Sequence, residues 1–67
     1  MTPQELSQQP YGQPLEVATS KGTISVTRRQ LEDGDIFIAK DAKGNEITSS
    51  GDADGLVRNL AMKGFNL

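Results

Sequence analysis

The chain lacks the two residue types on which most small catalytic and metal sites depend. Its 67 residues include no cysteine and no histidine. Disulfides and thiolate metal sites are therefore excluded, and the commonest metal ligand and neutral-pH proton carrier is missing. An enclosed catalytic cleft is also hard to build in a domain of this size. We expect a protein that is not an enzyme and that holds no metal and no cofactor.

Long apolar runs and an excess of positive charge are missing as well. No stretch approaches the ~20 apolar residues that span a bilayer. The N-terminus has no basic segment followed by an apolar one, the pattern of a signal peptide. A net charge of −2 argues against general binding to a phosphate backbone. The composition predicts a cytoplasmic protein with no membrane partner.

The first part of the chain has few apolar side chains. All three prolines lie within the first 14 residues, and Leu6 and Tyr11 are the only large apolar residues there besides Met1. Such a segment buries too little area to offset the entropy lost on ordering. We expect residues 1–13 to form a flexible Pro/Gln-rich tail with polyproline-II character, and residues 14–67 to form a single small domain. Alternatively, residues 9–14 act as a docking peptide with Tyr11 as its anchor.

Alternation of apolar and polar residues predicts strands in the middle of the chain. Residues 15–18 and 24–27 alternate in this way, and Gly22 suits the turn between them. Residues 35–40 contain four consecutive apolar side chains, which is typical of a central strand. After a turn that ends at Gly44, residues 45–49 return as a weak edge strand.

The C-terminal part has the pattern of an amphipathic helix. Ser50 or Asp52 can cap its start, Gly64 can end it, and apolar residues at helical spacing lie between them. The sequence predicts an α+β domain: a three- to four-stranded antiparallel β-meander with one C-terminal helix packed on one face. The predicted core consists of Leu15, Val17, Ile24, Val26, Leu31, Ile36, Ile38, Ile47, Leu56, Val57, Leu60, Ala61 and Phe65.

A contact surface is predicted on the sheet face opposite the core. Phe37 alternates with two predicted core residues, so it falls on that face together with Ala39. An exposed aromatic on an uncovered face marks an interaction site, and a domain this small gains stability by dimerising. The leading hypothesis is a non-catalytic interaction module that docks on another protein or on a second copy of itself. The predicted partner-binding residues are Phe37, Ala39, Arg28, Arg29 and Lys40.

Basic residues support an alternative hypothesis, a DNA-binding accessory protein. Lys21 and Lys40 would join Arg28 and Arg29 on a three-stranded sheet face. In topology alone, over residues 15–63, the layout resembles the arm-type DNA-binding modules at integrase N-termini, whose sheet enters the major groove. The negative net charge disfavours this alternative.

A weaker alternative is a calcium-binding domain. Ser50, Asp52 and Asp54, followed by Gly55, resemble the start of an EF-hand loop. The twelfth position, where the bidentate glutamate belongs, is Ala61. Capping of the helix explains the same residues without a metal ion.

Overall fold

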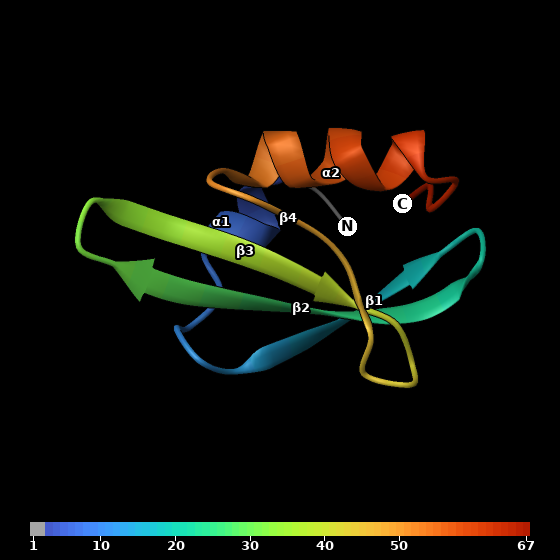
Figure 1. Ribbon diagram of the computed structural model, residues 1–67, viewed down its shortest axis with the longest axis horizontal. Helices are drawn as coiled ribbons and strands as arrows, with labels where there is room; N and C mark the ends of the chain where they lie inside the picture. The colour runs from blue at the N-terminus through green and yellow to red at the C-terminus, as the bar shows by residue number, and fades with distance from the viewer. Residues whose placement is uncertain (1–2) are drawn as a thin grey trace.

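The fold is a four-stranded antiparallel β-meander with two helices on one side of the sheet (Figure 1). The computed structural model describes residues 3–67. Strand order follows the chain, so each strand pairs with its neighbour in sequence. The predicted α+β meander with a C-terminal helix is confirmed. The elements are α1 Pro3–Ser7, β1 Pro14–Thr19, β2 Gly22–Leu31, β3 Gly34–Lys40, β4 Glu46–Ser50 and α2 Ala53–Met62.

The turn between β3 and β4 forms where the sequence predicts it. The Asp41 carboxylate accepts hydrogen bonds from the backbone N–H groups of Asn45 and Lys43, at 3.0 and 2.9 Å. These donors, Asn45 foremost, lower the pKa of Asp41. Gly44 closes the turn with φ of +86°, a left-handed conformation that side chains with a Cβ adopt at a cost. Short-range polar contacts therefore fix this hairpin.

Helix α2 begins and ends at the predicted signals. The side chain of Asp52 accepts a hydrogen bond from the N–H of Gly55, which makes Asp52 the N-cap. Gly64, at φ of +90°, ends the helix and donates its N–H to the carbonyl of Ala61. Ala61 itself is exposed, so its placement in the predicted core is wrong. It lies about 100° around the helix from buried Leu60 and therefore faces solvent.

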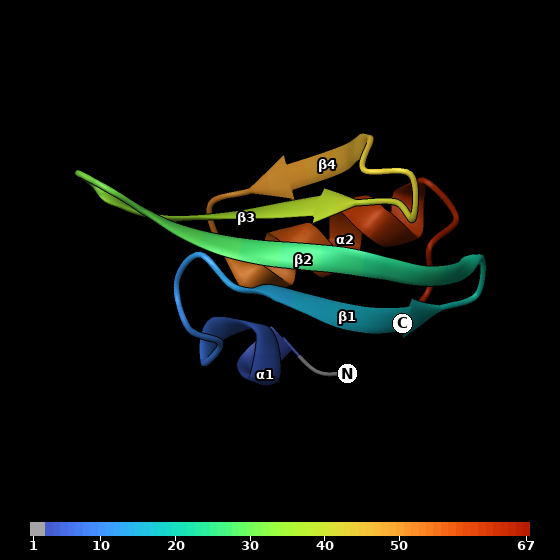
Figure 2. The ribbon, with the colours of Figure 1, turned by 90° about the horizontal axis from the view of Figure 1, so that it is seen from below.

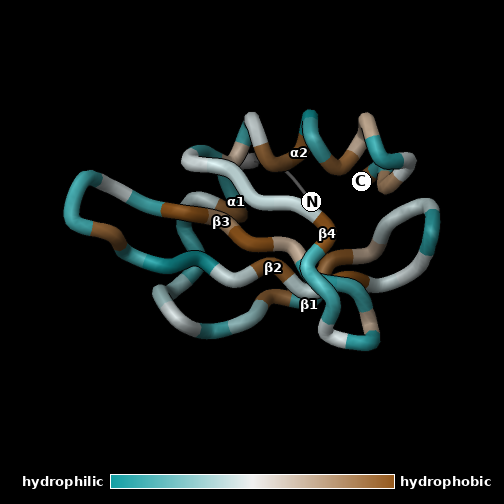
Figure 3. The backbone as a smooth tube through the Cα atoms, viewed as in Figure 1, coloured by the Kyte–Doolittle hydropathy of each residue, from teal (hydrophilic) through white to brown (hydrophobic). Residues whose placement is uncertain are grey.

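The core lies between the sheet and the helices, where Figure 3 shows the hydrophobic residues of α2 facing the strands. Most of the predicted core residues are buried in this core or packed against it. The buried residues are Leu6, Val17, Ile24, Val26, Phe37, Ala39, Ala53, Leu56 and Leu60, with Leu15, Ile47, Val57 and Phe65 partly buried around them.

The central strand β3 turns the opposite face to the core from the one predicted. Phe37 and Ala39 are 3% and 0% exposed beneath the helices, so their prediction as exposed contact residues is wrong. Ile36 and Ile38, predicted as core, are half-buried on the other face. A run of four apolar residues does not indicate which face of the strand is buried. Pairing with β2 determines it, because buried Val26 pairs with Ala39 and paired residues lie on the same face of the sheet.

The end of the β2–β3 hairpin projects past α2 (Figures 1 and 2). Leu31 lies there with 53% of its surface exposed, so its assignment to the core is wrong. The apolar alternation predicts a strand only as far as residue 27, whereas β2 continues to Leu31 and carries it beyond the helices. Figure 3 shows mostly hydrophilic residues at this end of the hairpin.

The N-terminal segment, residues 3–13, packs against the sheet and α2. Helix α1 replaces the expected polyproline-II structure, and its Leu6 is fully buried in the core, so that expectation is wrong here. Gln9 is 6% exposed, and its Nε2 donates a hydrogen bond to the carbonyl of Val26 at 2.9 Å. A five-residue helix has no stability of its own, so these tertiary contacts hold it in place. The first two residues of the expected tail lie outside the described residues.

Candidate interaction surface

One face of the sheet carries no covering element within residues 3–67. Figures 1 and 2 show both helices on the same side of the strands, and in Figure 2 the sheet lies in front of α2. We call the uncovered side the open face. Strand pairing arranges its side chains in rows across the strands. These rows are Glu16–Ser25–Lys40–Glu46, then Pro14–Thr27–Ile38–Ser49, then Arg29–Ile36.

The open face combines an apolar centre with charges of both signs. Ile36 and Ile38 are half-buried in β3, so part of each side chain stays in contact with solvent. Exposed Arg29 lies beside Ile36 at one end of the face. At the other end, exposed Lys40 lies in one row with two carboxylates. Mixed composition of this kind is typical of surfaces that contact other proteins.

The open face has two hollows. One, of about 500 Å³, is lined by residues of β1, β2, the end of β3 and the β3–β4 turn, among them Glu16, Ser25 and Lys40. A smaller one, of about 170 Å³, lies between Arg29 and Ile38. Their lining includes threonine, serine and charged side chains together with isoleucine. Such depressions accept side chains of a facing surface, as close packing at an interface requires.

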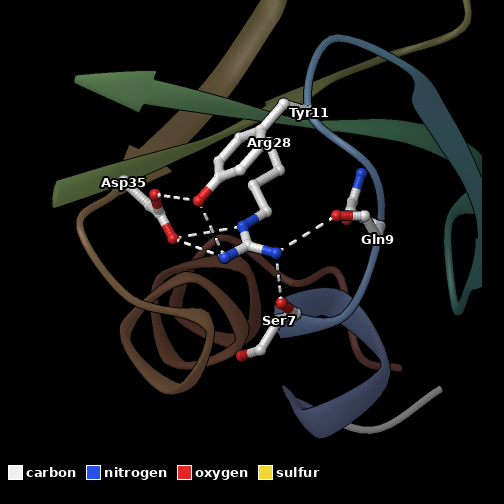
Figure 4. A network of polar contacts seen from close by, with 5 residues as sticks. All are labelled: Ser7, Gln9, Tyr11, Arg28 and Asp35. Carbon is white, nitrogen blue, oxygen red and sulfur yellow. Dashed lines mark hydrogen bonds and ion pairs between the residues drawn. The ribbon is translucent and has the colours of Figure 1, made fainter.

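Arg28, a predicted contact residue, points to the helix side and is fully occupied there (Figure 4). Its Nε and Nη2 donate to Asp35 Oδ2 at 3.1 and 2.7 Å. Nη1 donates to the backbone carbonyls of Ser7 and Gln9, and the guanidinium lies 4.4 Å from the ring centre of Tyr11. These contacts within the molecule give no support to Arg28 as a partner-binding residue. Arg28 holds the N-terminal segment against the sheet.

Tyr11 completes this network. Its hydroxyl donates to Asp35 Oδ1 at 2.7 Å and accepts from Arg28 Nη2 at 3.1 Å. The hydrogen bond to the carboxylate raises the pKa of Tyr11, whereas hydrogen bonds from Arg28 and Tyr11 lower the pKa of Asp35. Tyr11 thus anchors its own segment within the molecule. This arrangement gives no support to a separate docking peptide at residues 9–14.

Acid should weaken the attachment of the N-terminal segment. Because the pKa of Asp35 is lowered on folding, its contribution to stability is complete above the unfolded pKa of about 4 and is lost as the pH falls through the folded value. We expect the melting temperature of the wild type to exceed that of Asp35→Asn at pH 7. The gap should narrow as the pH falls below about 4 and close once the Asp35 carboxylate is protonated, because the side chain is then neutral like asparagine. Thermal melts of both proteins across this range test it, and a gap independent of pH would refute the assignment.

The remaining predicted residues are dispersed. Arg29 and Lys40 lie on the open face as predicted for contact residues, whereas Phe37 and Ala39 are buried. Lys21, invoked for DNA binding, lies on the helix side. Its Nζ donates to a backbone carbonyl at the end of α2 and lies 5.2 Å above the ring of Phe65. A continuous basic surface made of all four predicted cations does not form.

Two of the three ligands of the calcium alternative, Ser50 and Asp52, make local contacts at the start of α2. Asp52 caps α2, and the hydroxyl of Ser50 accepts a hydrogen bond from the N–H of Asp52 at 3.4 Å. Among the described residues, no group of three or more acidic side chains is arranged to hold a metal ion. The motif acts as a helix start.

Sequence reasoning missed the acidic members of the open face, Glu16 and Glu46. A signal for Glu16 was present, because it alternates with the predicted core residues Leu15 and Val17. Glu46 could not be placed, because a β-bulge between β3 and β4 shifts the register beside Lys40. The bulge pairs Glu46 with Lys40 and thereby places it on the open face.

Comparison with known proteins gives no relative from which a role could be transferred. No protein-family model, no curated protein and no solved structure matches this chain. No helix within residues 3–67 is long and apolar enough to cross a membrane. The function proposed below therefore depends on the open face.

Proposed function

We propose that this protein is a small non-catalytic interaction module that binds another protein surface through the open face of its sheet. The observation that carries the proposal is the contrast between the two faces. One is covered by α1, α2 and the N-terminal segment, while the other presents Ile36 and Ile38 between Arg29 and Lys40 without a covering element. An apolar centre with a charged surround is suited to a protein partner.

The charge of the open face favours a protein over a nucleic acid. The open face carries two cations, Arg29 and Lys40, and two carboxylates, Glu16 and Glu46. These charges sum to zero. Non-specific DNA binding depends on neutralising several phosphates, with each contact adding about 0.9 to the salt slope. Two cations beside two acids supply few such contacts. DNA binding remains the second candidate because Arg29 and Lys40 do share this face.

A photo-crosslinker on the open face tests the proposal. Lys40 is replaced by a diazirine-bearing lysine analogue in cells that express the protein naturally, and Lys63, exposed beside the end of α2, is replaced in the same way as a control. Irradiation is expected to yield a protein adduct from position 40 and none from position 63.

Each other outcome has a definite meaning. A nucleic-acid adduct from position 40 would support the second candidate and contradict the first. Equal adducts from both positions, or none from either, would mean that the open face does not bind a protein.

A further inference from the structure

The chain contains two Asp-Gly pairs, Asp33–Gly34 and Asp54–Gly55, a combination of residues that is prone to rearrange. The backbone nitrogen of the glycine attacks Cγ of the aspartate and closes a five-membered ring. Glycine favours this reaction, because it has no Cβ to hinder the attack and its backbone adopts conformations that other residues avoid. Whether the ring forms in a folded chain depends on how firmly the structure holds the pair.

The first pair lies at the end of the β2–β3 hairpin that projects past α2 (Figures 1 and 2). β2 ends at Leu31 and β3 begins at Gly34, so Asp33 belongs to neither strand. Both residues of the pair are exposed, and the space where a Cβ of Gly34 would lie is open. Among the residues that the structure describes, none holds the Asp33 carboxylate by a hydrogen bond or an ion pair. Leu31 and Gly34 form the last pair of the ladder, so the tip opens at the cost of that pair alone.

The second pair lies in the first turn of α2 and is held there. The N–H of Gly55 donates a hydrogen bond to the side chain of Asp52, the N-cap of the helix. A Cβ on Gly55 would collide with the hydroxyl oxygen of Ser50, so this glycine is closely packed. Ring closure would also rotate the Cα–C bond of Asp54 away from the helical ψ of about −42°. The reaction would therefore break the start of α2.

We propose that the bond between Asp33 and Gly34 is a site of spontaneous modification, at which the aspartate converts to isoaspartate. The protonated carboxyl group of Asp33 reacts with the amide of Gly34. The Cγ–N bond forms, the Cγ–OH bond breaks, and the hydroxyl group leaves with the amide hydrogen as water. A second water then opens this succinimide at the carbonyl next to Cα, where the C–N bond breaks. The backbone now runs through Cγ, and a free carboxylate remains on Cα.

The product places a distinct chemical group at the hairpin tip. Isoaspartyl carboxyl methyltransferases transfer a methyl group from S-adenosylmethionine to the carboxylate on Cα of isoaspartate and leave ordinary aspartate unmodified. The tip lies outside the core, which is covered by the helices, so such an enzyme reaches this carboxylate without unfolding the domain. The modification restores the water that it loses, so the mass and the net charge of the chain do not change. The site is independent of the proposed function.

Ageing of the full chain at 37 °C and neutral pH, once folded and once in concentrated urea, tests the proposal. Isoaspartate is located with a protease that cleaves before aspartate but not before isoaspartate, and methyl transfer from labelled S-adenosylmethionine counts the sites. In the folded chain, isoaspartate should form at position 33 about tenfold faster than at position 54 or more, because the hairpin tip opens more readily than the helix. In urea the two positions should convert at similar rates.

The matched control is Asp33→Glu, which keeps the charge but has a side chain one methylene too long for a five-membered ring. This variant should lose the methyl-accepting site of the folded chain, and its melting temperature verifies that it is folded. Equal rates at the two positions in the folded chain would overturn the proposal. So would a folded chain that accumulates no isoaspartate at position 33 while the chain in urea converts, or methyl transfer that Asp33→Glu leaves unchanged.

Discussion

Replacing Phe37 with alanine is expected to lower the free energy of unfolding by about 3–5 kcal/mol. The side chain is 3% exposed, and its ring lies 5.9 Å from the Arg28 guanidinium, so the change removes core packing and a contact to the N-terminal network. A chain of this length has a total stability of about 3–10 kcal/mol. The variant should therefore lose a large part of its total stability, which circular dichroism during urea denaturation measures.

The neighbouring isoleucine is the matched control. Ile36→Ala removes an apolar side chain of the same strand that is half-buried on the open face. Its cost should be about half that of Phe37→Ala or less, because part of the isoleucine surface is already in water. The reverse order of stability would mean that β3 turns its other face to the core.

Replacing Leu6 with alanine is expected to cost about 2–5 kcal/mol, the usual range for a fully buried leucine. Leu6 is 0% exposed and belongs to the same core as α2. Leu31→Ala, at a position that is 53% exposed, should change stability by less than about 0.5 kcal/mol. Urea denaturation of both variants measures the difference.

The comparison of these two leucines shows whether the N-terminal segment is a flexible tail or a packed part of the domain. A flexible tail would make Leu6→Ala neutral and indistinguishable from Leu31→Ala. A packed segment makes Leu6 part of the cooperative unit, so that its loss lowers the stability of the whole sheet. We expect the loss of stability, because Arg28 donates hydrogen bonds to this segment and Gln9 of the segment donates one to Val26.

Features fixed by short-range contacts were predictable from the sequence. The turn at Gly44, the capping of α2 by Asp52 and the end of α2 at Gly64 each depend on residues within a few positions of one another. Such signals do not require knowledge of the rest of the fold. The meander and the C-terminal helix followed from them.

Features fixed by pairing between distant residues were not predictable in this way. Which face of β3 is buried depends on Val26 across the strand pair, and the N-terminal segment is ordered by Arg28, which lies 21 positions beyond Ser7. One pattern in the sequence does indicate where Arg28 and Arg29 lie. Arg28 continues the alternation of Ile24 and Val26, so an unbroken β2 places it on the core side and Arg29 on the open face.

The contacts of the N-terminal segment connect the fold to the proposed function. Arg28, Tyr11 and Asp35 hold the N-terminal segment on the helix side, where it completes the cover of the core. The open face, by contrast, has neither a helix nor a segment across it in residues 3–67. Binding there requires no rearrangement of the core, so a partner can dock on a preformed surface.

The most direct measurement compares photo-crosslinking from positions 40 and 63 in cells that express the protein naturally. The account predicts a protein adduct from position 40, on the open face, and none from position 63. Equal adducts from both positions, or none from either, would contradict it.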